Sequence, residues 1–142
     1  MEALDYLGAL PGRRSRAMVR HMRPHGDPVV RAYRGLTLVA VGEAPVTVAA
    51  RCFRTDDREV RALTLGALLS REAQGDAFRR VARALLLEGL QDDELAVRLE
   101  AARGLAFYGE PADIGVLTPL LLDETVALRV EAAGAILQIG IR

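Results

Sequence analysis

The chain has 142 residues, about half of them apolar, and no net charge at neutral pH. A chain of this length fits one domain and can bury enough apolar surface to fold without a metal or a disulfide. The single cysteine, Cys52, excludes an internal disulfide. Aromatic residues are few and Trp is absent, so the core must be built from Ala, Leu and Val, which suit close packing between helices.

Charge is distributed unevenly along the chain. All 19 basic residues are arginine; residues 1–87 hold 15 of them against 9 acidic residues, and residues 88–142 hold 4 against 10. The two parts therefore carry net charges of +6 and −6. This asymmetry would favour head-to-tail association or the oriented approach of a charged partner; a solvated surface without such a role is the alternative.

The N-terminal residues lack the basic segment and apolar run of a signal peptide. No apolar run reaches the roughly 18 residues that a membrane span needs. We therefore expect a cytoplasmic protein without a membrane partner.

Apolar residues recur at helical spacing along the whole chain, which predicts nine helices. A lead-in helix over 2–9 is followed by four pairs. The first helices of the pairs are expected over 13–23, 44–54, 76–90 and from Pro111 to Asp123. The second helices begin near Val30, Val60, Val97 and Leu128.

The four second helices align without gaps, at steps of 30, 37 and 31 residues. Each begins with an aliphatic residue followed by arginine. Acidic residues precede each start: Asp27, Asp56-Asp57, Asp92-Asp93-Glu94 and Asp123-Glu124. Twelve residues after the aliphatic residue, three of the four carry glycine: Gly42, Gly109 and Gly140.

Each part of this repeat has a physical reason. An acid at a helix start accepts hydrogen bonds from free N–H groups and meets the positive end of the helix dipole. Glycine ends a helix in the left-handed conformation at low cost. Small residues such as Ala101, Ala102, Ala132 and Ala133 let neighbouring helices approach closely, so a large residue at Ala133 is expected to overpack the seam.

The segments Asp93–Gly109 and Leu128–Gly140 resemble HEAT-like repeats of the bilin-lyase type, whose second helix reads D-x-x-V-R-x-x-A-A-x-A-L-G-x-I-G. The resemblance is strong over 92–142, moderate over 56–91 and weak over 27–42, where Arg34 and Thr37 replace alanine. It implies an all-α fold, a right-handed α-solenoid of four helix pairs in one domain over 1–142. The repeats would span 13–42, 43–72, 76–109 and 111–140, after a lead-in over 1–12.

The resemblance also implies roles for particular residues. The repeated Arg31, Arg61, Arg98 and Arg129 would form a ladder with the turn acids between neighbouring repeats. The second helices would line the concave side and bind another protein. The residues expected to face outward there are Tyr33, Glu100, Arg103, Phe107, Glu131 and Gln138. Phe107 is the expected anchor of that surface, with packing under the next turn as the alternative.

Signatures of catalysis and of metal or cofactor binding are missing from the sequence. His21 and His25 are four residues apart, but zinc needs three or four ligands and the chain has no further histidine. The acidic clusters lack the spacing of a calcium loop and are explained by capping. We therefore expect a non-enzymatic scaffold without a cofactor; an enzyme or a pigment-handling protein is a lesser alternative.

Two further features suggest partners. Arg13, Arg16, Arg20 and Arg23 recur on one face of a predicted helix and could contact nucleic-acid phosphates; a solvated terminal helix is the alternative. The last helix, about 125–139, is apolar nearly all round. It would pair with a second copy through Ile136, Ile139 and Ile141, dock another protein, or continue into a longer solenoid.

Overall fold

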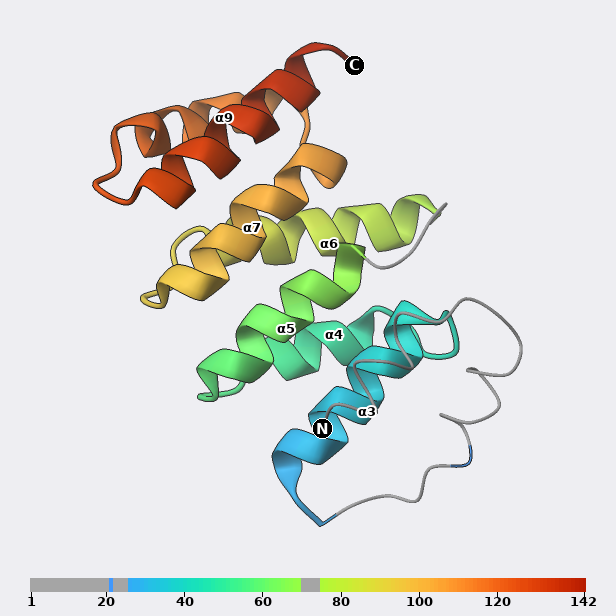
Figure 1. The fold of residues 1–142 in the computed structure, drawn as a ribbon. Helices are drawn as coiled ribbons and strands as arrows, with labels where there is room; N and C mark the ends of the chain where they lie inside the picture. Colours follow the sequence, from blue (N-terminus) through green and yellow to red (C-terminus); the bar gives the residue numbers. More distant parts are fainter. Residues whose placement is uncertain (1–20, 22–25, 70–74) are drawn as a thin grey trace. The chain divides into compact units, whose positions relative to one another are not determined.

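The computed structural model describes residue 21 and residues 26–69 and 75–142, in which every element of secondary structure is helical (Figure 1). The chain divides into two compact units, Met1–Gly75 and Asp76–Arg142. The predicted lead-in helix and nearly all of the predicted helix at 13–23 lie outside the described residues.

The first unit contains three described helices: α3 (Pro28–Ala40), α4 (Thr47–Phe53) and α5 (Arg58–Leu69). Each of the three packs against the other two. Their shared core is apolar apart from the buried Thr37 and Thr64, and its buried side chains include Val39, Phe53, Val60, Leu65 and Leu68. Helix α3 is therefore a second helix of the repeat, and α4 with α5 is the following pair.

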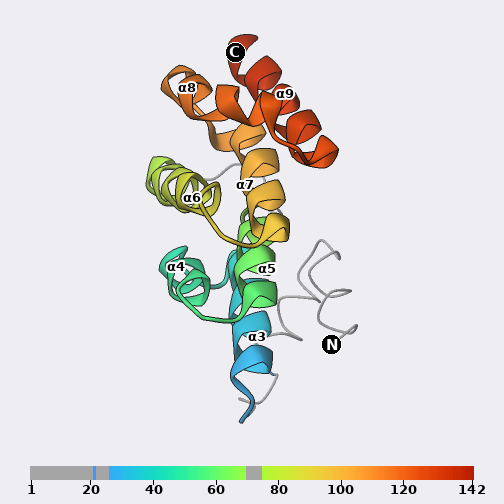
Figure 2. The same ribbon diagram turned by 90° about the vertical axis from the view of Figure 1, so that its left-hand side faces the viewer.

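The second unit contains two pairs. The first is α6 (Asp76–Gly89) with α7 (Leu95–Tyr108). The second pair opens with a broken helix, η1 (Pro111–Asp113), α8 (Ile114–Leu117) and η2 (Thr118–Leu122), and closes with α9 (Val126–Gly140). Pro119 interrupts the first helix because it lacks an N–H donor. In this unit α6 and α8 lie on one side and α7 and α9 on the other (Figure 2), with α7 packed against both α6 and α9.

The acids before α3 and α5 cap their helices, as predicted, whereas α7 and α9 have no side-chain cap. Asp27 Oδ1 accepts the N–H groups of Val29 and Val30 at 2.7 and 3.3 Å. Asp57 Oδ1 accepts that of Val60 at 3.1 Å. Before α7 and α9 the acids act in the preceding turn, where Asp92 and Asp123 each accept the N–H two residues later. Only the bonds at α3 and α5 satisfy donors that a helix start leaves free.

The four repeated arginines share one contact with the turn before their own helix; the predicted ladder between neighbouring repeats stays a prediction. Arg98 Nη1 donates to the carbonyls of Asp92 and Asp93 at 2.7 and 2.8 Å, and Arg129 donates to the carbonyls of Asp123 and Glu124. Arg61 and Arg31 donate to carbonyls five or six residues earlier in the same way. The guanidinium thus closes the turn before its own helix through backbone carbonyl oxygens.

The aliphatic residue at the start of each segment faces inward. Val60, Val97 and Leu128 are at most 2% exposed, and Val30 is half-buried. With the shared arginine contact, this confirms that α3, α5, α7 and α9 are equivalent elements.

The glycine prediction is right at one position and wrong at two. Gly42 is left-handed, with a φ of 84°. Gly109 is extended, with φ −68° and ψ 155°; glycine is needed there because a Cβ would lie 2.5 Å from the Leu105 carbonyl oxygen. Gly140 is the last residue of α9 itself. The overpacking prediction at Ala133 is also wrong, because that residue is exposed.

Candidate protein-binding surface

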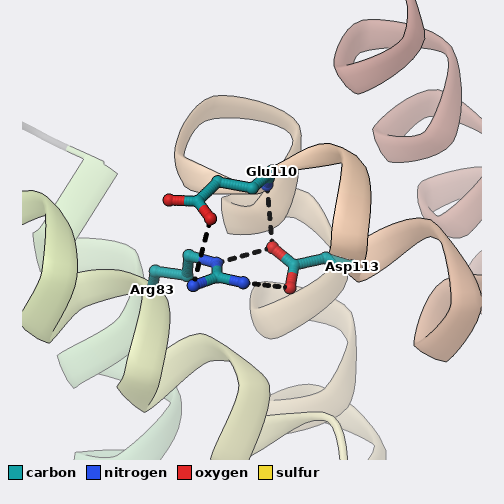
Figure 3. A network of polar contacts seen from close by, with 3 residues as sticks. All are labelled: Arg83, Glu110 and Asp113. Atoms are coloured by element: carbon teal, nitrogen blue, oxygen red, sulfur yellow. Dashed lines mark hydrogen bonds and ion pairs between the residues drawn. The ribbon is translucent and has the colours of Figure 1, made fainter.

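A part-buried ion pair joins the two helix pairs of the second unit (Figure 3). Arg83 on α6 donates from Nε and Nη2 to the two carboxylate oxygens of Asp113, at 2.7 and 2.6 Å. The Glu110 N–H donates to Asp113 Oδ2 at 2.8 Å, and the Glu110 carboxylate lies 3.4 Å from Arg83 Nη1. Asp113 is 3% exposed, so its charge depends on these partners.

The protonation of this pair follows from its contacts. Burial acts to raise the pKa of Asp113, but the hydrogen bonds from Arg83 and Glu110 and the charge of Arg83 hold the pKa below its ordinary value. The hydrogen bond to Asp113 raises the pKa of Arg83. Both groups are therefore charged at neutral pH, and the network links η1 to α6. No pattern in the sequence marks Arg83 on α6 as the partner of Asp113.

Three of the predicted site residues form a charged cluster across α7 and α9. Arg103 Nη1 lies 3.0 Å from Glu100 Oε1, and Arg103 Nη2 lies 2.7 Å from Glu131 Oε1 on α9. The hydrogen bond to Glu131, followed by the charge of Glu100, raises the pKa of Arg103. The Arg103 side chain is 49% exposed, so the pair adds little to stability. Its effect is to fix where the guanidinium and carboxylates point.

Phe107 lies at the end of α7 with 60% of its surface exposed, which rules out packing under the next turn. The next residue, Tyr108, is buried against Phe78, with ring centroids 6.1 Å apart. Arg142 donates to the carbonyls of Ala106 and Phe107, each at 2.8 Å. The backbone that carries Phe107 is therefore held from both sides while the ring faces solvent.

The predicted outward-facing residues are brought together only in part. Glu100, Arg103, Phe107, Glu131 and the exposed Gln138 lie on α7 and α9, and we call this set the α7–α9 ridge. Tyr33 is half-buried and belongs to the other unit.

The self-association prediction named the wrong face of α9. Ile139 is 3% exposed and Ile136 is half-buried; the Ile139 side chain packs where a Cβ on Gly109 would be. Ile141 alone of the three is well exposed, at 69%. The other large apolar residues on the outside of α9 are Val126, Val130 and Leu137, which are 62%, 63% and 62% exposed. A helix that is apolar all round gives no periodic signal for its inner face, although the repeat register places Ile139 at the position of the buried Tyr108.

A family model for HEAT repeats matches residues 47–138, well over half of the chain. The chain belongs to the HEAT-repeat family. The match runs from the start of α4 nearly to the end of α9 and so covers the α7–α9 ridge. No curated protein matches the chain.

The described part of this HEAT-repeat protein offers little for other chemistry. Among its residues no group of three or more His, Cys, Asp or Glu side chains could hold a metal ion. None of its described helices is long and apolar enough to cross a bilayer. Cys52 is half-buried, and burial raises the pKa of its thiol, which disfavours the reactive thiolate. Arg13, Arg16, Arg20, Arg23 and His25 lie outside the described residues.

Proposed function

We propose that this HEAT-repeat protein is a non-enzymatic scaffold that binds another protein through the α7–α9 ridge. The observation that carries the proposal is Phe107, an exposed aromatic ring on a backbone fixed by Tyr108 and Arg142. Stacked helix pairs present their second helices as extended binding surfaces. The ridge lies on two such helices.

The composition of the ridge supports protein recognition. Aromatic residues and arginine are enriched at the centres of protein interfaces, and here Phe107 and Arg103 lie one helical turn apart on α7. Arg103 is already oriented by Glu100 and Glu131. A side chain ordered before binding loses less conformational entropy in the complex.

The charge of the ridge indicates which residues the partner should carry around its contact with Phe107. Residues 88–142 carry a net charge of −6, and the ridge exposes Glu100 and Glu131 in part. A partner with an apolar pocket for Phe107 and basic residues around it would be complementary. Its association rate would fall as salt rises, because steering between opposite charges is screened.

The test is quantitative affinity capture from the native cells with the wild-type chain and with Phe107→Asp. Phe107→Asp should lose a specific partner while folding normally, because the ring contributes little to the core. The matched control is Val116→Asp, an exposed apolar residue on α8 (47% exposed), which should retain the partner. Equal recovery with wild type, Phe107→Asp and Arg103→Glu would show that the ridge is not the binding surface.

Binding of a nucleic-acid backbone through Arg13, Arg16, Arg20 and Arg23 stays a prediction from the sequence. A mobility-shift assay with generic duplex DNA at low salt tests it, since contacts of this kind are salt-sensitive. If micromolar protein gives no shift, the prediction is withdrawn.

A further inference from the structure

The solvent-facing side of α9 is apolar along its whole length. The exposed residues of this helix are Val126, Ala127, Val130, Ala133, Gly134, Leu137, Gln138 and Gly140, followed by Ile141. None of them is charged, and only Gln138 carries a polar side chain. The opposite side of the same helix, with Leu128, Ala132, Ala135 and Ile139, is buried within the unit. Contiguous exposed apolar surface of this kind marks interaction sites in soluble proteins.

The two charged residues of α9 lie beside this face, and both already have hydrogen-bond partners within their own unit. Arg129 donates to the carbonyls of Asp123 and Glu124, and Glu131 accepts from Arg103 at 2.7 Å. Covering the exposed face would therefore require no unpaired charge to leave water, which is the costly step in burying a helix surface.

Large and small side chains on this face are arranged symmetrically about the middle of the helix. Val130 and Leu137 lie equally far from the midpoint between Ala133 and Gly134, and so do Val126 and Ile141. A two-fold axis through that midpoint would place Val130 opposite Leu137 of another copy and Val126 opposite Ile141. Large residues would meet at both ends and small residues at the crossing. A two-fold interface requires such self-complementarity.

Gly134 has no role in the packing of its own unit. A Cβ built there meets no atom within 4 Å, although glycine inside a helix costs about 1 kcal/mol relative to alanine. Gly104 on α7 is different, because a Cβ there would collide with Leu86. Close packing of another helix against Gly134 would explain why this position lacks a side chain, which the packing of its own unit does not explain.

We infer that the exposed face of α9 docks against the same face of a second copy, with the two helices antiparallel and crossing at Ala133 and Gly134. The inference rests on the proposed binding function and names a second copy as one partner. A helix of 15 residues is about 22 Å long and offers less than the roughly 800 Å² per partner of a stable interface. The dimer is therefore concentration-dependent.

Sedimentation of the full chain over a range of concentrations tests this inference. Wild type should shift from monomer to dimer, and Val130→Glu should raise the dissociation constant about tenfold or more, because the symmetry buries two unpaired carboxylates. The same substitution at Val116 on α8 is the matched control and should leave the constant unchanged. A wild-type chain that stays monomeric at all concentrations, or equal effects of the two variants, would overturn the inference.

Salt separates this dimer from head-to-tail association. The antiparallel pair brings together two copies of the part with net charge −6, so higher salt should leave the dimer unchanged or strengthen it by screening repulsion. Head-to-tail contact would join this part to the +6 part and would weaken in salt. Weakening in salt therefore rejects the α9 pairing.

The register is tested by cross-linking in a Cys52→Ser background with a short bismaleimide. A mixture of Val126→Cys and Ile141→Cys copies should give a cross-linked dimer, and each variant alone should give much less. Equal yields in all three samples reject the antiparallel register.

Capture of a partner by the α7–α9 ridge is measured separately. If Val130→Glu keeps the captured partner but the wild-type chain never dimerises, this inference fails and the proposed function stands.

Discussion

Helices α7 and α9 carry the same repeat and use it differently. In register, Val97 corresponds to Leu128 and Arg98 to Arg129; both aliphatic residues are buried and both arginines close the turn before their helix. The outer sides differ. Ala102 on α7 is fully buried, whereas the corresponding Ala133 on α9 is exposed.

The difference separates two kinds of information in a repeat. The arginine and the inward aliphatic residue act within one helix pair, so their contacts recur from repeat to repeat. Burial of the outer side depends on the next layer, because each repeat completes its core against a neighbour. Helix α7 has α9 against it, and within the described chain the outer side of α9 faces solvent.

The largest expected effect comes from truncating the inner side of α9. Leu128→Ala should lower the free energy of unfolding of the second unit by about 2–5 kcal/mol, because it leaves a cavity at a fully buried site. Leu137→Ala, which removes the same atoms from a side chain that is 62% exposed, should change it by less than about 0.5 kcal/mol. Hydrogen exchange of the α7 and α9 amides in dilute protein measures both.

Dilution matters because a dimer through α9 would make Leu137 contribute to stability as well. The predicted difference between the two sides of α9 is wrong if Leu137→Ala lowers the free energy of unfolding of the monomer as much as Leu128→Ala does. Both sides of α9 would then be buried in the single chain.

Much of this architecture could be predicted from the sequence. The repeated acid, aliphatic residue and arginine gave the correct second helices, since each acts on atoms a few residues away, as the contacts of Asp57 and Arg98 show. The exposed position of Phe107 and the shared face of Glu100 and Arg103 also followed, because helical spacing fixes which residues lie together.

Features that depend on contacts between distant residues could not be predicted. Arg83 meets Asp113 from 30 residues away, and local spacing marks neither residue as the partner of the other. Periodicity within α9 does not distinguish Ile139 from Leu137, because apolar residues surround the helix; the repeat register does, since Ile139 occupies the position of the buried Tyr108.

The first helices of the two pairs in the second unit are joined by charge: Arg83 on α6 binds Asp113 at the start of the next pair. Asp113→Asn should lower the free energy of unfolding by about 2 kcal/mol, because it weakens two charge-assisted hydrogen bonds from Arg83. This is less than for a fully buried pair, since the Arg83 side chain is 28% exposed. Val116→Asn, on the surface of α8, is the control.

The pH dependence gives this prediction a sign. The pKa of Asp113 is lowered in the folded protein, so the pair stabilises fully above the unfolded value of about 3.9. That stability is lost as the pH falls through 3.9 toward the lower folded pKa. Denaturant titrations between pH 6 and pH 3 should therefore show a smaller loss of stability for Asp113→Asn than for the wild type. If both proteins lose the same stability over this pH range, the ionisation of Asp113 does not contribute to the free energy of unfolding.

The smallest effects should differ in sign between α7 and α9. Gly104→Ala adds a methyl group against the fully buried Leu86, and we expect a loss of about 1–2 kcal/mol from overpacking. Gly134→Ala adds the same group where nothing lies within 4 Å, so helix propensity alone should raise the stability of the monomer by about 0.5–1 kcal/mol. Thermal unfolding of dilute protein reports both changes. Two changes of the same sign would mean that Gly134, like Gly104, packs within its own chain, and α9 would then have no open face to offer a second copy.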